Sequence, residues 1–422
     1  MSPIEIVATL VTLTALAGYL NERFIRLPPT IGVTLGGLLV SLVLVALGTV
    51  GFDGRNRAAA VLATIPFDRL LMEGLLGVLL FAGALHIDVR QLMRQKWPIL
   101  LLSTVGILIS TFVVGTLVYG VARALSLPLS YSFALLFGAL ISPTDPVAVL
   151  SLLKRARVSR ELEVVISGES LFNDGVGVVV FVLVASLTAG GHVPTFAEGV
   201  RIFLHQAVGG ILFGLALGWV GFELLRRVDH FTVEIMLTLA LVVGGYTLAG
   251  RLHTSGPLAI VVAGIVVGNP GRAYAMSGNT WAHLDTFWLV LDEMLNAILF
   301  MLIGLEVLAL PLSGRFLLAA GLAVAATLLA RWVSVVIPLR LMHRRWRFAP
   351  YTVRILTWGG LRGGIAIALA LSLPASPERA LVLVMTYAVV VFSILVQGLT
   401  IESLALRAAA HGAPAGPAAG GS

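Results

Sequence analysis

The chain has 422 residues, of which 58% are hydrophobic and 12% are charged, and its formal net charge is +7. Soluble domains carry about 25% charged residues, so this composition excludes a soluble globular protein and indicates an integral membrane protein. The basic side chains fall between hydrophobic segments rather than along one surface, so the positive charge indicates no nucleic-acid partner. The absence of cysteine excludes disulfide and thiolate chemistry.

A helix needs about twenty mostly apolar residues to cross the hydrocarbon of a bilayer. By this rule the sequence predicts about thirteen transmembrane helices, at 4–20, 31–50, 69–87, 98–120, 130–153, 161–187, 202–225, 233–250, 256–268, 286–310, 316–340, 353–373 and 380–401. We therefore expect an all-α polytopic membrane protein with a single membrane domain over 1–407. The Ala/Gly/Pro-rich segment 408–422 is expected to be a disordered tail. The first hydrophobic segment lacks the basic region of a cleavable signal peptide and is expected to be retained.

The basic residues predict the orientation of these helices. An odd number of spans places the two termini on opposite sides of the membrane. With the N-terminus outside, 18 of the 28 Lys and Arg residues fall in inner loops and 8 in outer loops, while Arg331 and Arg362 lie inside spans. Because cytoplasmic loops are enriched in Lys and Arg, we expect the N-terminus outside and the C-terminus in the cytoplasm.

The predicted span at 130–153 cannot form one continuous helix, because Pro143 and Pro146 interrupt it. Each proline lacks an amide hydrogen and clashes with the carbonyl four residues earlier, which loses its usual partner. Irregular backbone at membrane depth is tolerated only where it is buried in protein or lines a wet cavity. Since Thr144 and Asp145 lie between the prolines, the sequence predicts an unwound polar segment rather than a simple kink.

The predicted span at 353–373 contains a second interruption, where glycines flank Arg362 on both sides. Glycine weakens a helix and lets another backbone approach closely. The two interrupted spans take corresponding positions if residues 1–190 and 230–405 form two repeats. Paired interruptions of this kind indicate an inverted-repeat transporter whose site lies at the interruptions. We therefore expect two broken helices that cross at the site.

Carboxylates follow the first interruption, within a span. A carboxylate in the hydrocarbon costs from about 2.5 to more than 10 kcal/mol, and such residues usually mark an ion or proton path. Residues three or four apart share one face of a helix, so Ser170, Asn173 and Asp174 project together, and Glu169 lies on the side of Asn173. Thr144 is placed to complete an oxygen cage with Ser170 and Asp174. Oxygen ligands suit a hard cation such as Na⁺, and no histidine cluster offers a soft-metal site.

Asp174 is the side chain at which a proton and a cation are expected to compete, because loss of water favours the neutral form of a carboxyl group. A group that holds either H⁺ or Na⁺, never both, gives obligatory exchange when the site faces the two sides in turn. Asn173 adds no charge beside it. We therefore expect one proton per monovalent cation and electroneutral exchange, whereas a carboxylate at position 173 would favour an electrogenic cycle.

Arginine at membrane depth needs an anionic partner, and Glu169 and Asp145 are both available to Arg362. We expect a structural ion pair between Glu169 and Arg362, with Asp145 stabilising the unwound segment. Arg331 is expected to reach the interface or to pair with Glu293. Glu293, Asn296 and Glu306 are interpreted as contacts between helices or as parts of a cation path. Glu73, at the start of its span, is interpreted as an interfacial residue, and Gln397 as a packing residue.

Three ordered segments of the chain resemble the monovalent cation:proton antiporter-1 family, which includes prokaryotic NhaP-type antiporters and the eukaryotic sodium/proton exchangers. These segments are Ser142–Val149, Gly168–Gly177 and Gly359–Gly364. The segment Asn296–Glu306 and the number of spans extend the likeness over nearly the whole chain. The resemblance implies an NhaA-like fold of inverted repeats, a homodimer and elevator-like alternating access.

The resemblance also implies that Asp174 binds the ion together with Ser170 and Thr144, and that Glu169 pairs with Arg362. Many members carry an acidic residue in the middle of the third span, where this chain has only Leu80–Ala84 in the sequence Leu-Phe-Ala-Gly-Ala. A ligand or a water-mediated contact from that helix is therefore missing.

The long cytoplasmic tail of the eukaryotic exchangers has no counterpart here, so the expected location is a prokaryotic plasma membrane. No cofactor is expected apart from the transported ions.

Other functions are less compatible with these residues. A K⁺/H⁺ antiporter is the nearest alternative, because oxygen ligands alone do not fix the size of the site. An intramembrane aspartyl protease would need Asp145 and Asp174 to share a proton at close range, and the prolines beside Asp145 fit a cation cage better. A channel would need a continuous pore, which one chain with buried ion pairs does not favour.

Overall fold

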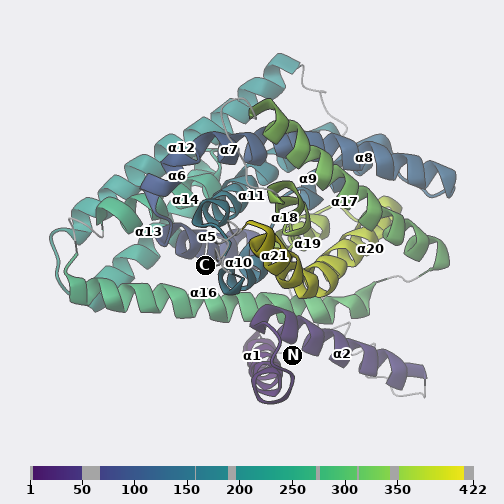
Figure 1. Cartoon of the computed structure of the whole chain (residues 1–422), viewed down its shortest axis with the longest axis horizontal. Coiled ribbons are helices and arrows are strands. Elements are labelled where there is room, and N and C mark those ends of the chain that lie inside the picture. The colour runs from purple at the N-terminus through teal and green to yellow at the C-terminus, as the bar shows by residue number, and fades with distance from the viewer. Residues whose placement is uncertain are drawn as a thin grey trace, which may run out of the picture.

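The structure is a computed structural model that describes residues 3–49, 67–156, 158–188, 196–271, 276–310, 313–342 and 351–412. Its described residues form helices and no strands (Figure 1). Nine of these helical segments are long and apolar enough to cross a membrane, and Leu70–Leu85, Tyr131–Ile141 and Gly256–Asn269 are shorter apolar helices. The prediction of an all-α polytopic membrane protein is confirmed.

The observed helices follow the predicted spans in chain order. The first half contains α1 (Pro3–Leu20), α2 (Pro29–Thr49), α4 (Phe67–Arg69), α5 (Leu76–Leu85), α6 (Val89–Arg94), α7 (Lys96–Leu101), α8 (Ile107–Ala124), α9 (Tyr131–Ile141), α10 (Val147–Arg155), α11 (Arg160–Thr188) and α12 (Phe196–Leu225). The second half contains α13 (Phe231–Arg251), α14 (Gly256–Val266), α16 (Gly278–Glu306), α17 (Gly314–Met342), α18 (Thr352–Trp358), α19 (Gly364–Leu371), α20 (Pro377–Phe392) and α21 (Gly398–Gly412). The tail was predicted to start at residue 408, whereas α21 continues as a helix to Gly412. Residues 413–422 lie outside the described residues.

The helices pack in two groups that face one another. In the first group, α16 packs against α1, α2, α5 and α13, while α14 packs against α5, α12 and α13. In the second group, α8 packs against α9 and α17, α17 packs against α20, and α9 packs against α11. Figure 1 shows α16 running along one edge of the molecule with α1 and α2 beside it, and the second group on the other side of α16. α11 joins the groups, since it also contacts α12 and α14.

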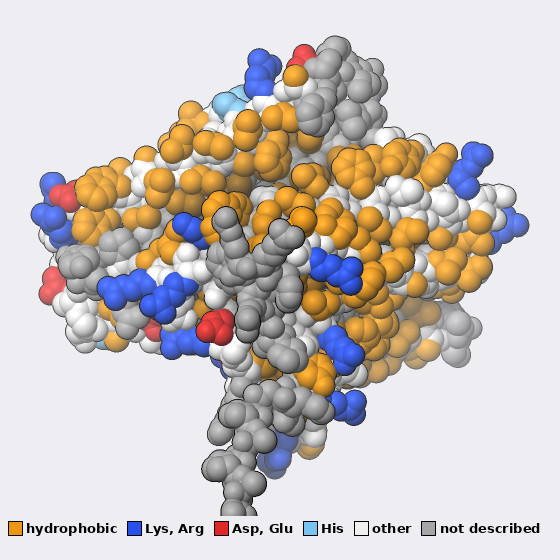
Figure 2. Space-filling view, turned by 45° about the horizontal axis from the view of Figure 1, so that its top comes forward, with side chains coloured by type: hydrophobic (Ala, Val, Ile, Leu, Met, Phe, Trp, Pro, Cys, Tyr) orange, Lys and Arg blue, Asp and Glu red, His pale blue; other side chains and the backbone are white. Residues whose placement is uncertain are grey.

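The outer surface of this bundle is apolar. Large hydrophobic side chains such as Leu212, Trp219 and Leu341 are more than 60% exposed. In Figure 2, hydrophobic side chains form broad areas of the visible face, and Lys and Arg stand in separate groups between and around them. Such extended apolar surface is stable in lipid and not in water, which agrees with the membrane location that the composition predicts.

Both interruptions predicted from sequence are present. α9 ends at Ile141 and α10 begins at Val147, so the backbone between the two helices is unwound around Pro143 and Pro146. α18 ends at Trp358 and α19 begins at Gly364, which leaves the glycine-rich segment unwound as well. The prediction of two broken helices is therefore confirmed.

Candidate functional site

The two unwound segments touch each other through their backbones. The amide of Asp145 donates to the carbonyl of Leu361 at 2.9 Å. The missing side chain of Gly363 makes this approach possible, because a Cβ atom there would overlap the Asp145 carboxylate. Ser393 supports the crossing, since its hydroxyl accepts from the amide of Arg362 at 3.0 Å. The broken helices cross as the paired interruptions predict.

At the crossing, charged side chains bond to the backbone groups that the two broken helices leave without helical partners. The Nη1 group of Arg362 donates to the carbonyl of Ser142 and, at 2.8 Å, to that of Pro143. Ser142 has no amide partner four residues later, because that residue is a proline. At the start of α10, Asp145 accepts from the amide of Val147 at 2.9 Å. Cations at carbonyl ends and anions at amide ends of helices are both favourable, and Asp145 stabilises the unwound segment as expected.

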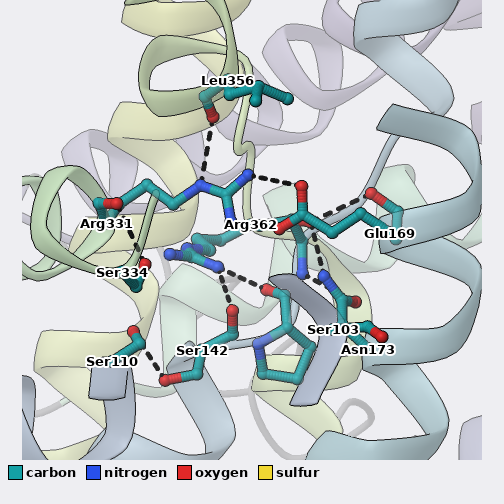
Figure 3. A network of polar contacts seen from close by, with 12 residues as sticks. Ser103, Ser110, Ser142, Glu169, Asn173, Arg331, Ser334, Leu356 and Arg362 are labelled. Carbon is teal, nitrogen blue, oxygen red and sulfur yellow. Dashed lines mark hydrogen bonds and ion pairs between the residues drawn. The ribbon is translucent and has the colours of Figure 1, made fainter. Parts of the chain in front are cut away.

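The ion pair of Glu169 is formed with a different arginine from the one predicted. Arg331 of α17 donates to both carboxylate oxygens of Glu169, to Oε2 at 3.0 Å, and its Nε donates to the carbonyl of Leu356 at 3.1 Å (Figure 3). The predicted pair of Glu169 with Arg362 was therefore wrong, as was the pairing of Arg331 with Glu293. Arg362 lies nearby but is held by backbone carbonyls, which serve as its partners in place of a carboxylate.

Thr144, Ser170 and Asn173 form one buried polar network. The hydroxyls of Thr144 and Ser170 are 2.9 Å apart, and the Asn173 amide donates to the Thr144 hydroxyl at 2.8 Å. Asn173 Oδ1 accepts from the backbone amide of Thr144 at 3.3 Å. All three side chains are at most 3% exposed. The network joins α11 to the unwound segment, as the shared helix face predicts, and supplies hydroxyl and amide oxygens beside the carboxylates.

Asp174 lines a large cavity between the two groups of helices. This side chain is 8% exposed, lines the cavity, and accepts no hydrogen bond from the described part of the chain. The cavity has a volume of about 1030 Å³. Thr144 and Asp145 also line it, whereas Ser170 and Asn173 lie behind the wall. The sequence predictions therefore gather at one place, with Asp174 and Asp145 close enough for their charges to interact.

The opposite wall of the cavity carries polar groups from α5 and α16. Asp292, Glu293 and Asn296 line it, and the Asn296 amide donates to Asp292 at 3.1 Å. Our sequence reasoning named Glu293 and Asn296 but missed Asp292. The signal was present, since a carboxylate four residues before an asparagine shares its helix face. His86, also missed, lines the cavity and contacts Asp285 through Nε2 at 3.1 Å.

Two other predicted polar residues lie away from the cavity wall. Gln397 donates to the carbonyl of Trp358 at 2.9 Å, which satisfies the end of α18 and confirms a packing role. Glu306 ends α16 and is absent from the cavity wall, as is Arg331. The side chain of Glu73 lies outside the described residues. No group of three or more His, Asp or Glu side chains within the described residues has the arrangement of a metal centre.

The family model of the transmembrane sodium/hydrogen exchangers matches residues 10–407. The chain belongs to the sodium/hydrogen exchanger family. This family comprises transporters, so the protein is a multi-pass membrane transporter and not an enzyme. The resemblance inferred from the three sequence segments is thus confirmed.

Relatives of similar length support the assignment. The chain is 48% identical over 410 residues to the Na⁺/H⁺ antiporter NhaP of Pseudomonas aeruginosa, covering 96% of each protein. It is 37% identical over 348 residues to the Na⁺/H⁺ antiporter NhaH of Halobacillus aidingensis, covering 80% of this chain and 82% of that one. The sodium proton antiporter MjNhaP1 of Methanocaldococcus jannaschii has the same fold, with a TM-score of 0.73, 20% identity and coverage of 96% and 99%.

Proposed function

We propose that this protein exchanges Na⁺ or Li⁺ for H⁺ across the prokaryotic plasma membrane, without net movement of charge, by alternating access at Asp174. The position of Asp174 carries this proposal: it is a carboxylate at membrane depth, in a cavity wall, with no hydrogen-bond donor among the described residues. A buried carboxylate without a partner is costly, and binding of either a proton or a cation relieves that cost. The relatives' activity as Na⁺/H⁺ antiporters supports the choice of ions.

The neighbouring side chains supply the rest of the proposed cation site. Thr144 offers its hydroxyl at the cavity wall, and Ser170 and Asn173 hold that hydroxyl in position. Asp145 lies on the same wall, where its charge favours a cation beside Asp174. These are oxygen ligands of the kind that Na⁺ and Li⁺ accept.

Exchange requires the site to open to one side at a time, and the two helix groups supply a basis for this. The cavity wall is built partly from α5 and α16 of the first group and partly from α11 and α19 of the second. Its open end is lined by Asp88, Gln91 and Lys154, next to loops that the distribution of basic residues places in the cytoplasm. In the proposed orientation, with the N-terminus outside, Asp174 therefore faces the cytoplasm. Movement of the second group against the first, within a homodimer, would carry it to the other side.

The proposal is tested by reconstituting the purified protein in liposomes that contain a pH dye. Na⁺ or Li⁺ added outside is expected to drive protons out of the lumen, so that the luminal pH rises. The rate is expected to stay the same when valinomycin and K⁺ clamp the membrane voltage, because the proposed cycle moves no net charge.

Each competing function gives a different result in this assay. A response to K⁺ but not to Na⁺ or Li⁺ would replace the proposal by K⁺/H⁺ exchange. A rate that changes with the clamped voltage would contradict electroneutrality. A luminal pH that does not respond to any of these ions, together with uptake of radioactive sodium into the same liposomes, would indicate a channel and overturn exchange altogether.

Replacing Asn173 by aspartate is expected to make exchange electrogenic. A second carboxylate beside Asp174 adds a proton site, so that two protons would move for each Na⁺. An inside-positive potential of 100 mV is then expected to accelerate Na⁺-driven proton efflux by about twofold or more, because one charge crossing that field gains about 2.3 kcal/mol.

Asn173→Ser is the matched control, because it also removes the amide that donates to Thr144 but adds no charge. It is expected to exchange slowly and without voltage dependence. Equal voltage responses in the two variants would show that the charge at position 173 does not set the stoichiometry.

A further inference from the structure

A polar stripe runs along the face of α16 that meets the cavity. Asp285, Asp292 and Asn296 lie seven and four residues apart, which places them on one side of the helix. Asp285 pairs with His86 at the end of α5, and Asp292 lies two turns further along, about 10 Å deeper by the rise of a helix. Asp292 and Asn296 line the cavity, whereas Asp285 does not.

Asp292 faces the unwound segment across the cavity. Its charge interacts with that of Asp145, which lies on the opposite wall beside Asp174. Asn296 donates one hydrogen bond to Oδ1 of Asp292, and no other hydrogen bond to this carboxylate is present in the described residues. The carboxylate oxygens of Asp292 therefore accept only this one hydrogen bond from the described residues, and Asp292 lines the same cavity as Asp174.

Asp292 and Asp174 belong to different helix groups. Asp292 lies on α16, which packs against α1, α2, α5 and α13, while Asp145 precedes α10 and Asp174 lies on α11. If the second group moves during transport, the distance between Asp292 and Asp174 differs between the two states. The charge of Asp292 then acts on the site when the cavity seen here is open, and acts much less when the opposite side is open.

We propose that Asp292 is a loading residue for the cation: held by Asn296 on α16, it draws Na⁺ from the open cavity toward Asp174 on that side of the membrane only. This inference rests on the proposed exchange function and adds a residue outside the motifs that identify the family. In the state that is open to the other side of the membrane, Asp292 does not contact the cation, so its effect is confined to one face of the membrane. The affinity of the protein for Na⁺ therefore differs between its two faces, and Asp292 contributes to that difference.

The test measures the Na⁺ KM of exchange separately at each face. Everted membrane vesicles present the cytoplasmic face to added Na⁺, and right-side-out vesicles present the external face. Asp292→Asn is expected to raise KM at the cytoplasmic face by about three- to tenfold, because one negative charge fewer in the cavity attracts the cation less strongly. The KM at the external face is expected to stay close to that of the wild type, and Asp292→Glu is expected to restore the cytoplasmic KM.

Asp285→Asn is the matched control, because it removes the same charge from the same helix face outside the cavity wall. It is expected to leave both KM values unchanged. If Asp292→Asn accumulates poorly, Asp292→Ser provides a second neutral variant for the same measurement.

An unchanged cytoplasmic KM in the neutral variants would overturn the loading role, and so would an equal rise at both faces, which indicates a structural effect. A rise in Asp285→Asn as large as that in Asp292→Asn would also overturn it, because general surface charge would then be the cause. Absence of exchange in the wild type would instead refute the proposed function.

Discussion

Replacing Asp174 by alanine is expected to abolish Na⁺-driven proton efflux from reconstituted liposomes, down to the level of liposomes without protein. Alanine offers neither a proton acceptor nor a cation ligand, so the two ions no longer compete for a common group. The hydroxyls of Thr144 and Ser170 and the amide of Asn173 cannot replace it, because these neutral groups carry no negative charge and do not bind and release a proton near neutral pH.

Loss of exchange in this variant should not result from loss of the fold. Asp174 accepts no hydrogen bond from the described residues and is desolvated, so its removal eliminates an unfavourable burial without breaking a contact. Purified Asp174→Ala is therefore expected to unfold at the wild-type temperature or above it. Thermal unfolding in detergent and size-exclusion elution check this directly.

Asp174→Asn is the closer steric control, since it keeps the volume and removes the charge. It is expected to be as inactive as alanine. Exchange at the wild-type rate in either variant would refute the assignment of Asp174, and Asp145, which also lines the cavity, would be the next carboxylate to test.

The features that could be predicted from sequence are those with strong local causes. Pro143 and Pro146 lie three residues apart, so two nearby backbone hydrogen bonds are lost and the helix is broken, and glycine on both sides of Arg362 weakens one. The spacing of Ser170, Asn173 and Asp174 fixes their common face on any helix. These local rules placed the unwound segments and the polar network correctly, because no competing arrangement satisfies them.

The pairing of Glu169 could not be predicted in the same way, because two arginines lie at membrane depth and helix packing decides between them. Gly360 favours the pairing with Arg331. A Cβ atom at position 360 would lie 2.5 Å from Arg331 Nε, so the glycine leaves room for the Arg331 side chain. Arg362 meanwhile meets the carbonyls of Ser142 and Pro143 at the crossing. Asp292 was missed although its spacing from Asn296 places both on one helix face, and the folded cavity shows that this face of α16 lines the same space as Asp145.

Replacing Arg331 by glutamine is expected to destabilise the protein more than any other single change at the crossing. It leaves the Glu169 carboxylate, which is 1% exposed, without its bidentate partner. Breaking a buried ion pair by removing one partner costs about 3–5 kcal/mol. The yield of folded protein and the thermal unfolding temperature in detergent are both expected to fall below those of the wild type and of Glu169→Gln.

The double variant Arg331→Gln with Glu169→Gln separates the ion pair from simple loss of contacts. With both charges removed, neutral amides fill the same space and no uncompensated ion stays buried, so the double variant is expected to be more stable than Arg331→Gln alone.

The surface pair of Arg227 with Glu223, at 2.7 Å on α12, is the matched control. Exposed pairs contribute about 0–1 kcal/mol, so Arg227→Gln should leave the unfolding temperature nearly unchanged. If Glu169→Gln fails to rescue Arg331→Gln but rescues Arg362→Gln, the cationic partner of Glu169 is Arg362, and the crossing is held together by a different ion pair from the one in the structure.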